Sequence, residues 1–215
     1  MTFDLFEPVH SADVEPLGEQ ACVLRGFALP FVSELLSGLE AIQAQAPLRR
    51  MVTPGGHTMS AAMSNCGALG WVTDERGYRY AASDPQSGRP WPAMPEAFLR
   101  LAGQASQQAG HGAFTPDACL INRYEPGARM SLHQDKNEKD LRAPIVSVSL
   151  GIAAVFLFGG HARGDRPRRV PLFHGDVVVW GGVDRMRFHG IAPLKPADHR
   201  QLGAQRINLT FRKAG

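Results

Sequence analysis

The sequence predicts a mainly β protein with flanking helices, and a jelly roll is the natural candidate for its core. From about residue 118 onward, short β-prone runs alternate with turn residues such as Pro126-Gly127 and Gly159-Gly160. Many short strands separated by polar turns are typical of a β-sandwich or barrel. The predicted strands are Cys119–Tyr124, Met130–Asp135, Ile145–Leu150, Ala154–Phe158, Val170–Phe173, Val177–Trp180, Arg187–Ile191 and Arg206–Arg212.

Two helices are predicted before these strands. From Pro30 to Ile42, apolar residues recur at helical spacing behind a proline. Pro95 to Ala109 has a similar pattern, and Gly110 is a suitable stop. Between them, residues 51–94 are rich in Gly, Ser, Thr, Met and aromatic residues without strong periodicity. We therefore predict a long, irregular and functional segment there.

The whole chain is expected to form one domain. It has 215 residues, of which 44% are hydrophobic, enough for a real core and too many for a disordered protein. We predict a single domain over 1–215, with an N-terminal extension at 1–115 and a jelly-roll core at 116–215.

Cysteine usage and hydropathy point to the cytoplasm. The three cysteines, Cys22, Cys66 and Cys119, are far apart and form no CxxC pair, which argues against a disulfide framework or a zinc knuckle. Acidic residues precede any apolar run at the N-terminus, so we expect no signal peptide. The longest uncharged stretch, Pro144–Gly160, is short for a membrane helix and contains a strand-like alternation. We expect no membrane span.

The net charge of +3 is unevenly distributed. Residues 1–110 carry 7 basic and 11 acidic side chains, whereas residues 111–215 carry 16 and 9. A basic half can attract nucleic acid or a small polyanion, although ordinary solvated charges explain it equally well. The loop Arg163–Arg169, with four arginines, invites the same two readings: phosphate contact or solubility.

A metal site is suggested by a His-x-Asp tripeptide, which occurs twice. In a strand, His133 and Asp135 would point to the same face and could share one ion. His174-Gly-Asp176 has the features of a turn, so we favour the first pair. His189, in another predicted strand, is the candidate third ligand. Two histidines and one carboxylate form the facial triad of non-haem Fe(II) oxygenases, although satisfied core or surface histidines remain an alternative.

The last predicted strand alternates strictly between polar and apolar residues. Ile207, Leu209 and Phe211 would pack outward from a pocket, and the opposite face would carry Arg206, Asn208, Thr210 and Arg212. Enclosed guanidiniums need anionic partners, and a dicarboxylate suits their planar fork. The alternative is an edge strand with its polar face in water.

These residues carry a resemblance to a known family. The sequence resembles the AlkB family of Fe(II)- and 2-oxoglutarate-dependent dioxygenases, and its bacterial alkylated-DNA repair members in particular, over nearly the whole chain. The most specific motifs are Asn122-Arg-Tyr124-Glu-Pro-Gly-Ala, Ser131-Leu-His133-Gln-Asp135-Lys, His174-Gly-Asp-Val-Val-Val-Trp-Gly-Gly182 and Arg206-Ile-Asn208-Leu-Thr-Phe-Arg212.

The resemblance implies a double-stranded β-helix (jelly roll, cupin-like) as the catalytic core, with helices and a nucleotide-recognition lid in the N-terminal extension. It assigns iron to His133, Asp135 and His189, and makes His174-Gly-Asp176 a structural turn. The residues implied to bind 2-oxoglutarate are Arg206, Asn208 and the Tyr124 hydroxyl at the far carboxylate, Asn122 and Arg212 near the keto-acid end, and Thr210 on the same strand face. Which arginine meets which carboxylate is left open.

The implied activity is repair of alkylation damage. With molecular oxygen, the enzyme would hydroxylate the alkyl group of 1-methyladenine or 3-methylcytosine and release formaldehyde, succinate and CO2. The expected partner is alkylated DNA, single- or double-stranded, with RNA as a further candidate, and the protein is expected to be a monomer. Two alternatives stay open: a dioxygenase acting on a protein or small molecule, and a non-catalytic barrel that binds metal or nucleic acid.

Substrate recognition is expected in the segment 51–94. A base inside a duplex must be flipped out to be reached, and it can then stack on aromatic side chains. The resemblance matches Trp71 to a base-stacking residue; without it, loop packing explains Trp71 better. The other implied substrate contacts are Met63, Tyr78, Tyr80, Arg163 and Asn137. Asn137 stands where the bacterial enzyme has an aspartate, which puts the preferred lesion in doubt.

Overall fold

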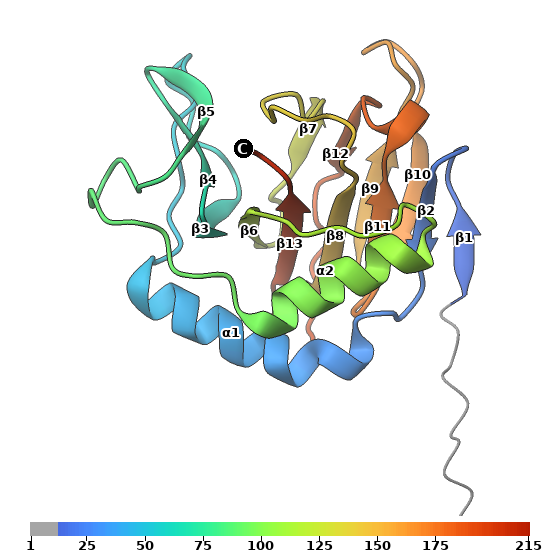
Figure 1. Ribbon diagram of the computed structural model, residues 1–215, viewed down its shortest axis with the longest axis horizontal. Coiled ribbons are helices and arrows are strands. Elements are labelled where there is room, and N and C mark those ends of the chain that lie inside the picture. Colours follow the sequence, from blue (N-terminus) through green and yellow to red (C-terminus); the bar gives the residue numbers. More distant parts are fainter. Residues whose placement is uncertain (1–12) are drawn as a thin grey trace, which may run out of the picture.

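Two antiparallel β-sheets packed against each other form the centre of the computed structural model, which describes residues 13–215 (Figure 1). The larger sheet has seven strands in the order β1-β2-β11-β8-β13-β6-β3, and the smaller has four in the order β10-β9-β12-β7. The bounds of the larger sheet's strands are, in that order, Val14–Pro16, Ala21–Leu24, Val177–Trp180, Ile145–Gly151, Arg206–Arg212, Ala118–Tyr124 and Ala62–Gly67. Those of the smaller are Arg168–Leu172, Ala154–Phe158, His189–Ile191 and Met130–His133. The predicted jelly roll is confirmed.

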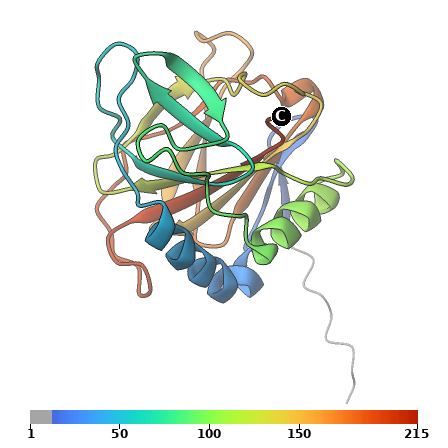
Figure 2. The same ribbon diagram turned by 60° about the vertical axis from the view of Figure 1, so that its left-hand side comes forward.

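The two predicted helices cover one face of the seven-stranded sheet (Figure 2). A 3-10 turn, Leu29–Phe31, leads into α1 (Val32–Gln45), and α2 spans Glu96–Gln108. Leucines of both helices lie in one buried cluster with Ile207, Leu209 and Phe211 of β13. Phe98 of α2 meets Phe211 edge-on, with ring centroids 5.8 Å apart. The apolar residues of β13 therefore face the helices, as predicted, and its polar residues face the other way.

A second buried cluster fills the space between the two sheets. It combines Trp180 and Tyr124 of the larger sheet with Phe156 and Ile191 of the smaller one. Because both faces of the larger sheet are covered, β8 and β13 are buried along their whole length. The polar residues of β13 are consequently enclosed and are not on a wet edge strand.

The prediction that residues 51–94 are irregular was wrong. The segment contains β3 and a two-stranded hairpin of β4 (Gly70–Asp74) and β5 (Gly77–Ala81), which we call the recognition hairpin after the role that the family resemblance implies for it. β3 showed no alternation because polar and apolar residues are buried together along it. The short strands β1 and β2 also escaped prediction; all four residues of β2 are buried, which removes the period of two.

Several strand boundaries also differ from the prediction. β7 ends at His133, so Asp135 lies beyond the strand and the argument from its pleat does not apply to it. β12 begins only at His189, because the preceding residues form a turn after a short 3-10 helix, Gly182–Asp184. β10 starts at Arg168, two residues before the predicted start.

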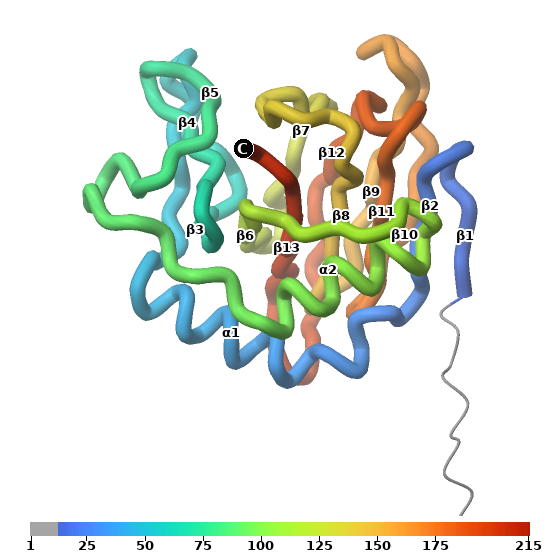
Figure 3. Tube along the Cα trace, in the orientation of Figure 1, coloured from blue at the N-terminus to red at the C-terminus, as the bar shows by residue number. Residues whose placement is uncertain are grey.

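The Cα trace shows how segments far apart in sequence meet (Figure 3). β13, the last strand, lies between β8 and β6 in the interior of the larger sheet. The residues on which the absence of a signal peptide was predicted lie outside the described part. Among residues 13–215, no helix is long and apolar enough to cross a membrane.

Candidate metal and cosubstrate site

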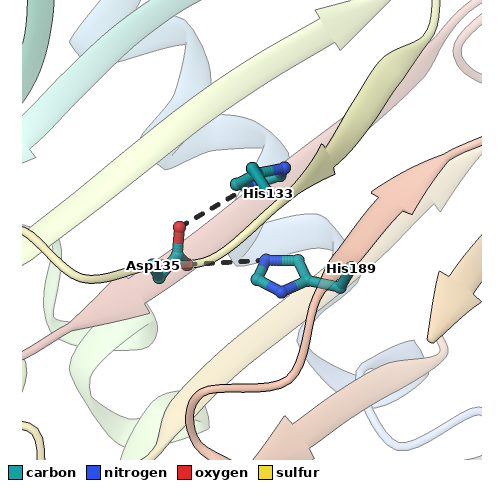
Figure 4. A group of neighbouring side chains, drawn as sticks. All are labelled: His133, Asp135 and His189. Atoms are coloured by element: carbon teal, nitrogen blue, oxygen red, sulfur yellow. Dashed lines mark ion pairs between the residues drawn. The ribbon is translucent and has the colours of Figure 1, made fainter. Parts of the chain in front are cut away.

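Three side chains converge where β7 and β12 pair. His133, the last residue of β7, is the register partner of His189, the first residue of β12. Asp135 follows two residues after β7 and turns back toward both rings, at 3.7 Å from each Nε2 (Figure 4). Ligand atoms of the three residues all lie within 4.8 Å of one another, so they can hold one metal ion. The fold thus brings the predicted triad together, although Asp135 lies beyond the strand on which the prediction placed it.

Backbone carbonyls fix both imidazole rings. His133 Nδ1 donates to the Ser131 carbonyl at 2.9 Å, and His189 Nδ1 donates to the Arg187 carbonyl at 3.0 Å. A carbonyl only accepts, so the proton of each neutral ring resides on Nδ1. The Nε2 lone pair of each ring is therefore free and faces Asp135. A metal binds the tautomer in which one ring nitrogen carries the proton and the other is free.

The electrostatics favour the metal-binding protonation states. Burial, aided by the neighbouring His133, lowers the pKa of His189 to about 3, so this ring is neutral near pH 7. Burial opposes ionisation of Asp135, but Arg212 and the two histidines hold the pKa of that carboxyl well below its usual range. Two imidazoles and one carboxylate on one side of a site fit Fe(II) and leave positions open for other ligands.

The second His-x-Asp forms a structural turn. Gly175 has φ +89°, a left-handed conformation that suits glycine. Asp176 accepts hydrogen bonds from the backbone N–H of Gly26 and Phe173 and pairs with Arg25 at 2.6 Å. His174 Nδ1 accepts from the Gly151 N–H at 3.0 Å, and its ring stacks on His199. The preference for the first tripeptide is supported by this geometry.

A polar wall runs along β13 and β6 beside the triad. Asn208 and Arg206 of β13 are register partners of Asn122 and Tyr124 of β6. The Asn122 amide donates to Asn208 Oδ1 at 3.3 Å, and the Thr210 hydroxyl donates to the same oxygen at 3.0 Å. All are buried, so the polar face of β13 lines the interior as predicted.

The two arginines of β13 have different partners. Arg212 donates from Nη2 and Nε to Asp135 Oδ2, at 2.7 and 2.9 Å, so it belongs to the metal end. Arg206 is 1% exposed, lies over the Tyr124 ring and donates from Nε to Ser149 Oγ. Its Nη1 has no hydrogen-bond partner among the described residues, and no carboxylate pairs with it there. A buried, unneutralised guanidinium is costly, so the Arg206 end of the wall fits a carboxylate of a bound dicarboxylate.

The recognition hairpin carries the aromatic candidates. Trp71 and Tyr78 stack with centroids 5.7 Å apart, and Tyr78 is 48% exposed. The Trp71 backbone is tied to Asn65 of β3 by two hydrogen bonds of 3.0 Å. Tyr80 points toward the metal end, where its hydroxyl donates to Glu138 at 2.6 Å. Met63 of β3 is fully buried opposite Asn122.

The remaining predicted substrate contacts lie around β7. Arg163 donates to the Leu132 carbonyl at 2.7 Å and covers the Phe188 ring. Asn137 is exposed in the loop after Asp135. The predicted loop Arg163–Arg169 ends earlier than expected, because Arg168 and Arg169 already belong to β10. Arg166, Arg168 and Arg169 are all exposed, and Arg168 pairs with Glu15 at 2.7 Å.

Sequence reasoning missed two residues beside the site, Glu138 and Arg185. Both are almost fully buried and they pair at 3.1 Å. The sequence gives neither residue a signal of its own, because neither lies in a periodic segment. The proximity of Glu138 to His133-Gln-Asp135 was the one available signal.

Comparison with known proteins gives a consistent result. The profile of the 2OG-Fe(II) oxygenase superfamily matches residues 20–212. The chain is 58% identical over 200 residues to the alpha-ketoglutarate-dependent dioxygenase AlkB of Salmonella typhimurium, covering 93% of each chain. It is 56% identical to the AlkB of Escherichia coli, covering 94% of this chain and 93% of that one. The solved structure of OsALKBH1 superposes with a TM-score of 0.82 at 27% identity, over 94% of this chain and all of that one. The chain belongs to the AlkB family of Fe(II)- and 2-oxoglutarate-dependent dioxygenases.

Proposed function

We propose that this dioxygenase removes methyl groups from damaged bases, with 1-methyladenine and 3-methylcytosine in DNA as substrates and RNA as a further one. The observation that carries the proposal is the contact between the recognition hairpin and the metal end. Tyr80 reaches Glu138, which lies three residues from Asp135, so the stacked Trp71 and Tyr78 belong to a hairpin anchored beside the triad. A planar base entering there would meet aromatic rings on one side and the metal ligands on the other.

His133, Asp135 and His189 would hold Fe(II), and the polar wall would hold 2-oxoglutarate. When bound, Fe(II) with 2-oxoglutarate and oxygen supplies the oxidising chemistry that hydroxylates the alkyl carbon, giving succinate and CO2, and the hydroxylated group leaves as formaldehyde. Arg206 would neutralise the far carboxylate, assisted by Asn208 and the Tyr124 hydroxyl. Asn122, Thr210 and Arg212 would line the part of the wall nearer the triad.

The chain's own contribution is orientation. Arg212 holds Asp135 ionised, and the Ser131 and Arg187 carbonyls keep both imidazoles in the ligating tautomer. Met63 closes the wall beside Asn122, so the cosubstrate side of the site is lined by buried groups. Such fixed and buried surroundings would direct the oxidation to the bound substrate.

Nucleic acid would be held by stacking and by charge. A flipped base stacked on an aromatic ring gains about 1–3 kcal/mol. Arg163, Arg166 and Arg169 are exposed and would meet the phosphate backbone, and the exposed Asn137 would meet the base edge. Because Asn137 is a neutral amide where the bacterial enzyme has a carboxylate, we propose that the ranking of lesions differs.

The remaining assignments are also proposals. We propose that the chain acts as a monomer in the cytoplasm, and that 1–215 is a single domain with the extension at 1–115 and the catalytic core at 116–215. The single domain is supported by the packing of α1 and α2, which belong to the extension, on β13 of the core.

Incubation with Fe(II), 2-oxoglutarate and an oligonucleotide bearing 3-methylcytosine or 1-methyladenine tests the activity. Formaldehyde and succinate should form in equal amounts, and the Asp135→Ala variant should form neither. Absence of both products from wild-type protein, with metal shown to be bound, would refute the proposal.

A further inference from the structure

The turn that precedes β12 contacts both sides of the metal triad. It runs from Gly181 to Phe188, and its Arg187 carbonyl accepts from the His189 ring. Its Met186 carbonyl accepts from the Gln134 side chain at 2.6 Å, one residue before Asp135. The turn is itself anchored, because Asp184 is fully buried, pairs with Arg187 and accepts from the Gln20 N–H.

Arg185 links this turn to the segment that follows β7. It is 2% exposed, and its three side-chain hydrogen bonds are all to that segment. Nη1 donates to the Asp135 carbonyl at 2.7 Å, Nε to the Ala143 carbonyl at 3.2 Å, and Nη2 to Glu138 Oε2 at 3.1 Å. One guanidinium thus clamps both ends of the segment from Asp135 to Ala143.

Glu138 lies between this clamp and the recognition hairpin. Its Oε2 is held by Arg185, and its Oε1 accepts from the Tyr80 hydroxyl. Oε1 also lies 3.4 Å from Arg212 Nε, and Arg212 is the partner of Asp135. Two carboxylates therefore compete for Arg212, and Arg185 neutralises one of them.

We propose that Arg185 is a positioning residue that couples the recognition hairpin to the metal ligands. By holding Glu138, it leaves Arg212 on Asp135 and presents a carboxylate oxygen to Tyr80; by holding the Asp135 carbonyl, it fixes the backbone of the metal ligand. Without Arg185, Glu138 draws Arg212 away from Asp135, and both the metal ligand and the docked hairpin loosen. The proposal concerns the site of the proposed function and deepens it.

A purely structural role predicts a different outcome. An arginine that only stabilised the fold would lower the melting temperature and leave the folded protein's metal affinity and kinetics unchanged. A positioning residue changes the metal environment itself. It also makes the effect of a hairpin substitution depend on whether Arg185 is present.

The test compares Arg185→Gln with Arg200→Gln, which removes an exposed arginine from another loop. The first readout is Co(II) affinity and the visible absorption spectrum of the Co(II)-loaded protein, which need no oligonucleotide. We expect Arg185→Gln to lower Co(II) affinity about 10- to 100-fold and to alter the spectrum, as is usual for groups that orient metal ligands. Arg185→Lys restores the charge without the forked contacts and should recover only part of the affinity.

The second readout is a double-mutant cycle with Tyr80→Phe, which removes only the hydroxyl that donates a hydrogen bond to Glu138. Tyr80→Phe alone should alter the Co(II) spectrum, although Tyr80 touches none of the three ligands. In the Arg185→Gln background it should have little further effect. With the 3-methylcytosine oligonucleotide, Arg185→Gln should also form succinate in excess over formaldehyde. If Arg185→Gln does not fold, the spectrum of Tyr80→Phe decides the matter.

The proposal is overturned if Arg185→Gln binds Co(II) like Arg200→Gln, if the two substitutions act additively, or if Tyr80→Phe leaves the spectrum unchanged. Failure of the proposed function is distinguishable. It would appear as no oligonucleotide turnover by wild-type protein, whereas the Co(II) measurements would still give a result.

Discussion

The interior face of the large sheet and the recognition hairpin differ in how their side chains are buried and held in place. On β13 and β6, the side chains of the polar wall are buried, and Arg206, Asn208 and Asn122 form hydrogen bonds with neighbours on adjacent strands. The hairpin has two strands paired only with each other, and Tyr78 at its tip is half exposed. Two-stranded hairpins have little stability of their own.

The hairpin instead depends on a few specific attachments. Asn65 holds the backbone of Trp71, Trp91 donates to the Ala81 carbonyl at 2.9 Å, and Tyr80 reaches Glu138. In the proposed function, the part that would hold metal and cosubstrate is therefore buried in the large sheet, and the part that would meet the base is held by a few contacts. Substitutions on the two parts should therefore give separable kinetic effects.

The largest effect is expected at the triad. Asp135→Ala removes the only carboxylate of the ligand set and leaves Arg212 without its main partner. Formaldehyde release from a 3-methylcytosine oligonucleotide should fall below detection, with a parallel loss of Co(II) binding measured by titration. Asp140→Ala is the matched control, because Asp140 pairs with the exposed Arg142 in the same loop. Equal activity of the two variants would contradict the assigned ligand.

Substitution of Arg206 should give the next largest effect, and this effect should be limited to binding of 2-oxoglutarate. Arg206→Lys keeps a charge but loses the fork, so KM for 2-oxoglutarate should rise on the order of 100-fold. Oligonucleotide affinity, measured by fluorescence anisotropy, should not change. Arg166→Lys in the basic loop should leave KM for 2-oxoglutarate at the wild-type value. A shift in oligonucleotide affinity for Arg206→Lys would show that the two parts are not separable.

Trp71→Ala should weaken oligonucleotide binding and leave KM for 2-oxoglutarate unchanged, the opposite of Arg206→Lys. Loss of one base-stacking platform should weaken binding of the alkylated oligonucleotide by about 1–3 kcal/mol, or roughly 5- to 150-fold. KM for 2-oxoglutarate and the Co(II) spectrum should stay as in the wild type. If Trp71→Ala raised KM for 2-oxoglutarate instead, Trp71 would belong to the packing of the fold and not to a binding surface.

The smallest effect is a pH dependence of stability in the metal-free protein. The pKa of His189 is about 3 when folded and about 6.5 when unfolded. Between these values the unfolded chain binds more protons, so the free energy of unfolding rises with pH and falls on acidification below about 6.5. His189→Gln should flatten this dependence by up to about 1.4 kcal/mol per pH unit in urea unfolding at pH of about 5 and about 7. An unchanged slope would mean that His189 is not buried as a neutral ring.

The segments with a regular pattern of polar and apolar residues could be predicted from the sequence. Arg206 to Arg212 alternate strictly, so their enclosed polar face was readable from periodicity together with the cost of buried charge. The two helices were readable for the same reason, and they begin and end within a few residues of the prediction. The triad was found by combining a motif with a third, distant histidine, and the family resemblance supplied its specificity.

What escaped prediction depends on tertiary contacts. β3 buries Ser64 and Asn65 alongside apolar residues, and their partners, the Ala46 carbonyl and the Trp71 backbone, are set only by the fold. Glu138 and Arg185 are charges in irregular segments, a context in which solvent exposure is the ordinary expectation. Their burial follows from the meeting of two loops 47 residues apart, which no local pattern encodes.

The place of β13 in the larger sheet has a consequence for biosynthesis. β8 and β6 each pair with it, and no other strand lies between them. A ribosome therefore releases both of these strands, with their facing edges unpaired, before the segment that joins them emerges. Arg206 and Arg212 arrive with that segment, so a nascent chain lacks the polar wall proposed to hold 2-oxoglutarate until β13 inserts between β8 and β6.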